Sequence, residues 1–202
     1  MNRRQFFNGT LAAAATAVPG QYALASLLQS LTTVSTSVAA VTGDGHEVEL
    51  EKAAVTELQE SLRGRLLLSG DEAYDQARRV LNPSIDKHPA LIVQPSGPAD
   101  VANAVTFANE RNLLLAVKCG GHSVAGRSTC DGGLQIDLSR FRNTRIDRKN
   151  KTAYVTGGSL LGDLDHESMS QGLVTTAGTV SHTGIGGLSL GGGFGRLARK
   201  YG

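Results

Sequence analysis

The chain has 202 residues, of which 25 are glycine, with 20 basic and 18 acidic side chains and a formal net charge of +2. This length is enough to bury a core. Basic and acidic residues alternate without forming a basic stripe, and no apolar run reaches the length of a membrane-spanning helix, so nucleic-acid binding and stable membrane insertion are not expected. Two cysteines are too few to define a disulfide framework.

The amino terminus predicts a twin-arginine export signal over residues 1–25. Arg3 and Arg4 form its basic region, an uncharged alanine-rich run covers 11–18, and the triplet from Ala23 to Ala25 supplies a cleavage site. The expected partner is the twin-arginine export machinery, and the expected location is periplasmic or secreted. A membrane anchor and a chance arginine pair are the alternatives. Cleavage would remove two basic residues and no acids, leaving eighteen of each sign.

The first part of the mature chain is predicted to be a linker followed by helices. Residues 26–45 are rich in small polar residues and have no charge before Asp44, which is typical of a linker. Within an N-terminal helical segment at 46–87, apolar residues at helical spacing predict a helix over 47–62. A second helix is expected over 71–81, ended by Asn82 and Pro83.

Residues 90–117 predict a βαβ unit. Strands are expected at 90–94 and 113–117, with a helix at 98–112 that places Val101, Val105 and Ala108 on one face. The two strands should form a parallel pair joined by a right-handed crossover. The loop after the second strand would then leave the carboxyl edge of the sheet, where open α/β arrangements bind ligands.

The remaining predicted elements are strands at 134–138 and 153–156, a helix at 159–171 and a strand-like run at 173–176. Ser159 is the expected N-cap of the helix, Asp163 lies near its positive end, and Gly172 ends it. The basic stretch 140–151 is interpreted as a solvated turn region.

The most informative motif is the run from Val117 to Ser123, which places one histidine in a glycine-flanked bend after an apolar segment. Gly120 and Gly121 lack a Cβ, so their backbone can approach a ligand closely and offer its amides. His122 would lie at the point of closest approach, largely neutral near pH 7. The structural alternative is a buried histidine satisfied by backbone groups.

A second motif is the glycine cluster 184–195, which contains seven glycines together with Ile185, Leu188, Leu190 and Phe194. A flexible linker would lack these apolar anchors, so the cluster is interpreted as backbone wrapped around a ligand. It has no glycine-lysine-serine/threonine ending, which excludes a P-loop. Residues 193–198 match the loose dinucleotide pattern, but no strand precedes them, so this match is attributed to chance.

Several short motifs, taken in order, resemble one family. They are Tyr-Asp-Gln-Ala-Arg at 74–78, His-Pro-Ala-Leu-Ile-Val-Gln-Pro at 88–95, Asp-Val at 100–101, Gly-Gly-His-Ser at 120–123, Ile-Asp-Leu-Ser at 136–139 and the glycine cluster. From about Tyr74 to its last residue the chain is similar to the berberine-bridge-enzyme-like FAD-linked oxidases of the vanillyl-alcohol-oxidase superfamily.

The resemblance implies an α+β fold of the p-cresol-methylhydroxylase (PCMH) type over 88–202. In it, a small subdomain containing the βαβ unit precedes a second α+β subdomain, and the domain is expected to be truncated at its carboxyl end. It also implies FAD joined to His122 through the 8α carbon of its isoalloxazine. The predicted cofactor-binding residues are His122, Cys119, Gly120, Gly121, Ser123, Gly126, Gly178, Thr179, Thr183, Gly184, Gly187, Gly191, Gly192 and Gly193.

The chain departs from the family at the position of a second, cysteinyl link. Val180 follows Gly178 and Thr179 there, and the two cysteines, Cys119 and Cys130, lie elsewhere, so a single link through His122 is expected. The cysteines could pair in an oxidising setting, or Cys119 could be a buried free thiol. His182 lies near the position of the missing cysteine. It could have a chemical role facing the flavin or the substrate, or a structural role.

By resemblance, the function is an FAD-dependent oxidation in which an alcohol or sugar gives hydride to flavin N5 and dioxygen reoxidises the flavin. The similarity stops inside a family motif at residue 202, so the catalytic base and part of the FAD site are expected beyond it. The alternative is a truncated fragment that binds flavin without turnover. No metal site is predicted.

Overall fold

The computed structural model describes residues 37–202. The predicted signal peptide at 1–25 and the first part of the predicted linker therefore lie outside the described residues. In the described range, the strands β1 (Val38–Val41) and β2 (Glu47–Leu50) form an antiparallel hairpin, followed by helix α3 (Lys52–Ser61). The hairpin corrects two expectations, because part of the expected linker is a strand and the expected helix begins only at Lys52.

The sequence around β2 explains that correction. Glu47 and Glu49 are exposed whereas Leu50 is buried, which is the alternation of a half-buried strand. Leu50 and Leu58 both belong to the core, and their separation fits a helix. Leu50, however, is the last residue of β2, and only Leu58 lies in α3. Segment 46–87, expected to be helical, also contains β3 (Arg65–Leu67) and only a short helix α4 (Tyr74–Arg78) in place of the predicted 71–81.

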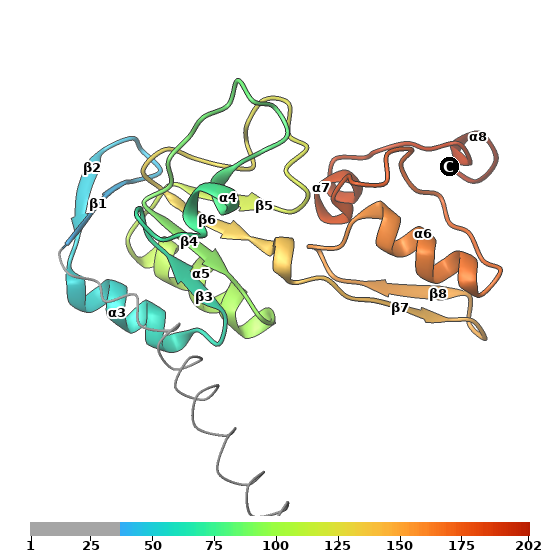
Figure 1. Cartoon of the computed structure of the whole chain (residues 1–202), viewed down its shortest axis with the longest axis horizontal. Helices are drawn as coiled ribbons and strands as arrows, with labels where there is room; N and C mark the ends of the chain where they lie inside the picture. Colours follow the sequence, from blue (N-terminus) through green and yellow to red (C-terminus); the bar gives the residue numbers. More distant parts are fainter. Residues whose placement is uncertain (1–36) are drawn as a thin grey trace, which may run out of the picture. The chain divides into compact units, whose positions relative to one another are not determined.

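The central sheet has the strand order β3–β4–β6–β5 (Figure 1). The strands β4 (Leu91–Gln94) and β5 (Leu115–Lys118) both run parallel to β6 (Leu134–Asp137), while β3 is antiparallel to β4. The βαβ prediction gave the parallel direction correctly, but β4 and β5 are not neighbours, because β6 is inserted between them. Leu91, Val93 and Ile136 in these strands are fully buried.

Helix α5 (Pro98–Glu110) connects β4 to β5 and packs with α3. Its buried face consists of Asp100, Ala104, Phe107 and Ala108, whereas Val105 is 42% exposed. Of the predicted face, Ala108 is buried, Val101 is half-buried and Val105 is exposed, so the prediction was wrong at Val105. One position of the buried face is a carboxylate, Asp100. A pattern that counts only hydrophobic residues does not recognise this position as buried.

The rest of the chain forms a second hairpin and three helices. The strands β7 (Thr144–Asp147) and β8 (Thr152–Val155) pair antiparallel after a short 3₁₀ turn η1 (Leu138–Arg140), and α6 (Leu161–Ser170) lies along them (Figure 1). The expected turn region at 140–151 thus contains a strand. α7 (Ile185–Leu190) and α8 (Ala198–Tyr201) follow, and residues 173–176 form no strand.

The start of α6 differs from the prediction in its cap. Leu160 is the N-cap, and Asp163 accepts a hydrogen bond from the Leu160 amide at 2.8 Å. The side chain of Ser159 instead hydrogen-bonds the backbone of Asn143, so it joins α6 to the start of β7. Gly172 ends the helix in the left-handed conformation, with φ +69°, as predicted.

Among residues 37–202, no helix is both long and apolar enough to cross a bilayer. The same residues contain no cluster of side chains suited to holding a metal ion.

Candidate functional site

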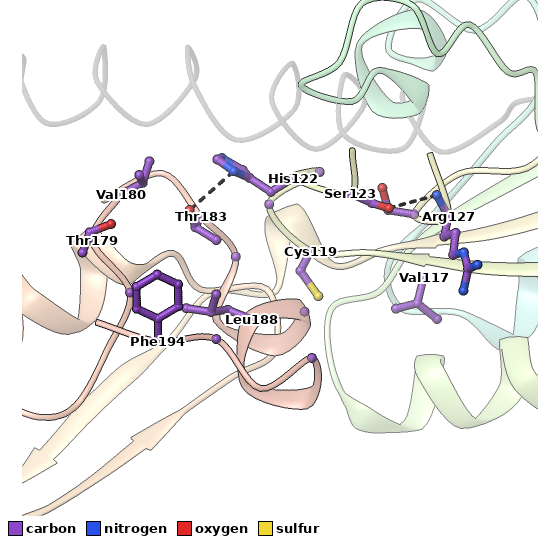
Figure 2. Close-up of a pocket in the computed structure, with 18 residues that line it drawn as sticks. Val117, Cys119, His122, Ser123, Arg127, Thr179, Val180, Thr183, Leu188 and Phe194 are labelled. Atoms are coloured by element: carbon purple, nitrogen blue, oxygen red, sulfur yellow. Dashed lines mark hydrogen bonds between the residues drawn. The ribbon is translucent and has the colours of Figure 1, made fainter. Parts of the chain in front are cut away.

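A cavity of about 780 Å³ opens where the chain leaves the carboxyl end of β5. Two segments far apart in sequence form its walls, the loop that starts at Cys119 and the stretch from Gly178 to Phe194 (Figure 2). The lining residues are Val117, Cys119, Gly120, Gly121, His122, Ser123, Arg127, Ser128, Gly178, Thr179, Val180, Thr183, Gly184, Gly187, Leu188, Gly191, Gly193 and Phe194. Both glycine motifs therefore meet at one site.

Two glycines allow these walls to meet. A Cβ on Gly120 would lie 2.4 Å from the amide nitrogen of Gly184, and a Cβ on Gly184 would lie 2.2 Å from the amide nitrogen of Gly120. Such distances are too short for any side chain, so the two backbones can be adjacent only because both residues are glycine. The second wall is held to α6 by the hydrogen bond from the Leu161 amide to the Thr183 carbonyl, 2.9 Å long.

A buried polar cluster lies at the carboxyl edge of the sheet, next to the residue where the first wall begins. Lys118, the last residue of β5, places its Nζ 3.5 Å from Oδ1 of Asp137 and donates to the carbonyls of Ala77 and Arg79. Burial lowers the pKa of Lys118, and the nearby carboxylate of Asp137 opposes that shift. These contacts anchor the end of β5 to the carboxyl end of α4, and so fix where the histidine loop starts.

His122 lies in the first wall, and its two ring nitrogens contact the second. Its Nε2 is 2.6 Å from Nδ1 of His182. Its Nδ1 is 3.4 Å from the hydroxyl of Thr183, the contact drawn as a dashed line in Figure 2. The two imidazole rings are 4.6 Å apart between centroids. Burial lowers the pKa of His122, and the proximity of His182 lowers it further, so the ring is neutral near pH 7.

Both cysteines in the described range are free thiols. Cys119 lines the cavity, where burial raises its pKa and a hydrogen bond from the Gly187 amide partly offsets that shift. Cys130 is buried elsewhere, and burial raises its pKa to about 11. The sequence left open a disulfide between Cys119 and Cys130 or a free thiol at Cys119, and in the structure Cys119 is a free thiol.

The cavity offers both polar and apolar surface. Within the described residues, the amides of Gly120, Gly121, His122 and Ser123 donate to no protein acceptor, and the Ser128 hydroxyl is buried without a partner. Arg127 adds a positive charge at this wall. Apolar side chains at Val117, Val180, Leu188 and Phe194 line the cavity as well, and Phe194 is largely exposed. A flat aromatic ring system with an anionic tail fits this combination of surfaces.

Twelve of the fourteen residues predicted to bind the cofactor line this cavity, and the exceptions are Gly126 and Gly192. Gly126 packs against Ile85 and accepts a hydrogen bond from Lys87, while Gly192, at φ +76°, lies in the turn after α7. Six lining residues were not predicted, namely Val117, Arg127, Ser128, Val180, Leu188 and Phe194. Of these, Val117, Val180, Leu188 and Phe194 lie in motifs that the sequence singled out, whereas Arg127 and Ser128 carried no signal.

A glycine-lined cavity at the carboxyl edge of a mixed sheet, with a neutral histidine and free backbone amides, defines the site of a cofactor-binding domain. A family model described as an FAD binding domain matches residues 89–202, more than half of the chain. The chain therefore belongs to this family of FAD-binding domains, and the predicted α+β fold of the PCMH type is confirmed.

Individual relatives support the same assignment. An FAD-linked oxidoreductase of Dictyostelium discoideum is 43% identical over 149 residues, which is 73% of this chain and 32% of the relative. The (R)-6-hydroxynicotine oxidase of Paenarthrobacter nicotinovorans is 33% identical over 142 residues, or 70% of this chain and 31% of that protein. Berberine bridge enzyme-like proteins are also among the relatives, so the predicted resemblance is confirmed. The chain spans about a third of the length of these relatives.

Solved structures share the fold. Chitooligosaccharide oxidase matches with a TM-score of 0.68 and 30% identity, over 74% of this chain and 32% of that one. The glucooligosaccharide oxidase of Acremonium strictum matches with a TM-score of 0.65 and 29% identity, over 71% of this chain and 30% of that one. The latter is described as carrying a 6-S-cysteinyl, 8α-N1-histidyl FAD.

Proposed function

We propose that this chain is the FAD-binding part of an oxidoreductase that oxidises an alcohol or a sugar and uses dioxygen as its electron acceptor. The oxidases among the relatives support this proposal, and the sugar-oxidising structures favour the substrate class. When bound, FAD supplies an N5 atom that accepts hydride from the substrate carbon.

The observation that carries the proposal is the position of His122. A neutral imidazole nitrogen is a nucleophile, and His122 presents one at the wall of the cavity beside free backbone amides. We propose that His122 forms the single covalent link to the 8α carbon of FAD. Val180 lines the cavity where a cysteinyl link would otherwise be expected, which supports one link and not two.

The other lining residues have distinct proposed tasks. The amides at 120–123, together with Arg127, would bind the negatively charged pyrophosphate or the polar edge of the ring. The apolar wall of Val117, Leu188 and Phe194 would exclude water from a face of the ring system. We expect a covalent histidyl link also to raise the reduction potential of the flavin.

A second candidate function is flavin binding without turnover. Among the described lining residues, the ionisable side chains are those of Cys119, His122 and Arg127, so the wall holds no carboxylate or tyrosine that could remove a proton from a substrate hydroxyl. If His122 is used in the link, the described residues that line the cavity supply no catalytic base. Anaerobic addition of alcohols and sugars separates the candidates, because bleaching of the flavin absorbance requires hydride transfer.

The covalent link is tested by acid precipitation. The purified 202-residue protein is expected to give a yellow precipitate whose flavin fluorescence stays with the polypeptide. His122→Ala should release all flavin into the supernatant, while the control His166→Ala, a change on the exposed surface of α6, should release none. A colourless precipitate from the unaltered protein would contradict the covalent proposal.

A further inference from the structure

The two nitrogens of His122 face different surroundings. Nδ1 lies on the side of Thr183, which lines the cavity, at 3.4 Å from the threonine hydroxyl (Figure 2). Nε2 lies 2.6 Å from Nδ1 of His182, which is not among the lining residues and is exposed to solvent. His122 thus lines the cavity, while its Nε2 contacts His182, a second histidine sixty residues later in the chain.

A hydrogen bond between two neutral imidazoles contains one proton, which allows two arrangements. If His122 Nε2–H donates to His182, then Nδ1 of His122 keeps its lone pair on the side of the cavity. If His182 donates instead, the proton of His122 sits on Nδ1, and neither nitrogen has a free lone pair. Only the first arrangement can form a bond from His122 to a carbon atom in the cavity.

We propose that His182 is a positioning residue whose Nδ1 accepts the Nε2 proton of His122, so that Nδ1 of His122 is the atom that bonds to FAD. This inference rests on the proposed covalent link and assigns the tautomer of His122 and the residue that selects it. Neither the family match nor the similarity to the relatives assigns a role to His182.

The hydrogen bond also allows the Nε2 proton of His122 to be transferred to water through His182. Formation of the bond from Nδ1 to the 8α carbon releases one proton from that carbon and makes the imidazole cationic. The Nε2 proton then passes to Nδ1 of His182, which is exposed and can return it to water. The two electrons left on the ring system reduce dioxygen, which takes up two protons and leaves as hydrogen peroxide.

The lowered pKa of His122 is consistent with this role. Burial and the proximity of His182 both disfavour a charged His122, so the nucleophilic form dominates near pH 7. Replacing His182 by an apolar residue removes the second cause and leaves burial, the larger one, in place.

The test combines two variants with a control. His182→Leu keeps bulk but has no acceptor, whereas His182→Asn keeps an oxygen near the position of Nδ1. His166→Leu is the matched control, because that histidine is exposed on α6 and its ring contacts Glu167, away from His122. Acid-stable flavin should form about 100-fold more slowly in His182→Leu, the scale on which a positioned proton acceptor contributes, and remain close to the unaltered rate in His182→Asn and in the control.

A second readout does not depend on flavin. In ¹⁵N spectra of the 202-residue protein produced under riboflavin limitation, His122 should be protonated at Nε2 and not at Nδ1, and this preference should be lost in His182→Leu. A His122 protonated at Nδ1, or equal loss of acid-stable flavin in the Leu and Asn variants, overturns the role of His182. A correct tautomer in a protein that never acquires acid-stable flavin supports the positioning role and refutes the covalent link.

Discussion

At the scale of single residues, the glycines of the site have two different tasks. Gly120 and Gly184 are required by contact between two backbones, since a Cβ on either would overlap the other. Gly187 also lines the cavity, but a Cβ there would meet no protein atom within 4 Å. The first pair holds the fold together, whereas Gly187 leaves open space in the cavity.

Alanine substitutions should separate these tasks. Gly120→Ala is expected to cost about 1–3 kcal/mol of unfolding free energy, because the overlap with Gly184 forces the backbones apart. Gly187→Ala should leave stability unchanged or slightly higher, since alanine favours helix α7, but should weaken flavin binding by filling the cavity. Thermal melting and flavin content measure the two effects. A stable Gly120→Ala protein would contradict the packing argument.

At the scale of elements, the beginning of α5 depends on a buried carboxylate. Asp100 is 2% exposed and accepts hydrogen bonds from the amides of Arg63, Gly64 and Ser96 and from the Ser96 hydroxyl. Burial alone would raise the pKa of Asp100, but these hydrogen bonds outweigh it and lower the pKa. The carboxylate thus joins α5 to the turn that follows α3, next to the edge strand β3.

Asp100→Asn should therefore destabilise the protein by about 2–3 kcal/mol at pH 7, because the amide cannot accept all of these hydrogen bonds. The folded pKa of Asp100 lies below the unfolded one, so its contribution is present at neutral pH and is lost as the pH falls through the acid range. The stability difference from the unaltered protein should accordingly shrink toward pH 3 in urea titrations. Glu57→Gln, an exposed change on α3, is the control and should show little effect at either pH.

At the scale of the whole molecule, we propose that the protein is exported in folded form to a periplasmic or secreted location. The support is the sequence at 1–25 alone, in which Arg3 and Arg4 precede an uncharged run and a small-residue triplet. A route that carries folded proteins suits a domain that must acquire FAD before export. The balanced charge of the mature chain gives no support for a nucleic-acid partner.

The export proposal predicts a clear fractionation result. Replacing both Arg3 and Arg4 by lysine should retain the protein in the cytoplasm with its amino terminus intact, whereas the unaltered protein should be exported and begin at residue 26. Fractionation and amino-terminal sequencing measure this. Lys52→Arg, which keeps the charge at an exposed position outside the signal, should not alter export.

The sequence predicted the family, most strands of the central sheet and most of the lining of the cavity. These signals are local: glycines flank His122 in a short bend, and apolar residues mark β4 and β6. Prediction failed where partners are distant in sequence. The insertion of β6 between β4 and β5, the buried Asp100 on α5 and the hairpin at β7 all depend on contacts that a periodic pattern does not contain.

The amino-acid sequence by itself determined the prediction that two glycine-rich segments and one histidine bind a cofactor, because backbone freedom and side-chain chemistry belong to individual residues. Only the tertiary structure decided that Gly120 lies against Gly184 and that His182 hydrogen-bonds His122. These contacts connect residues about sixty positions apart, and packing of the whole domain, not any local preference, brings them together.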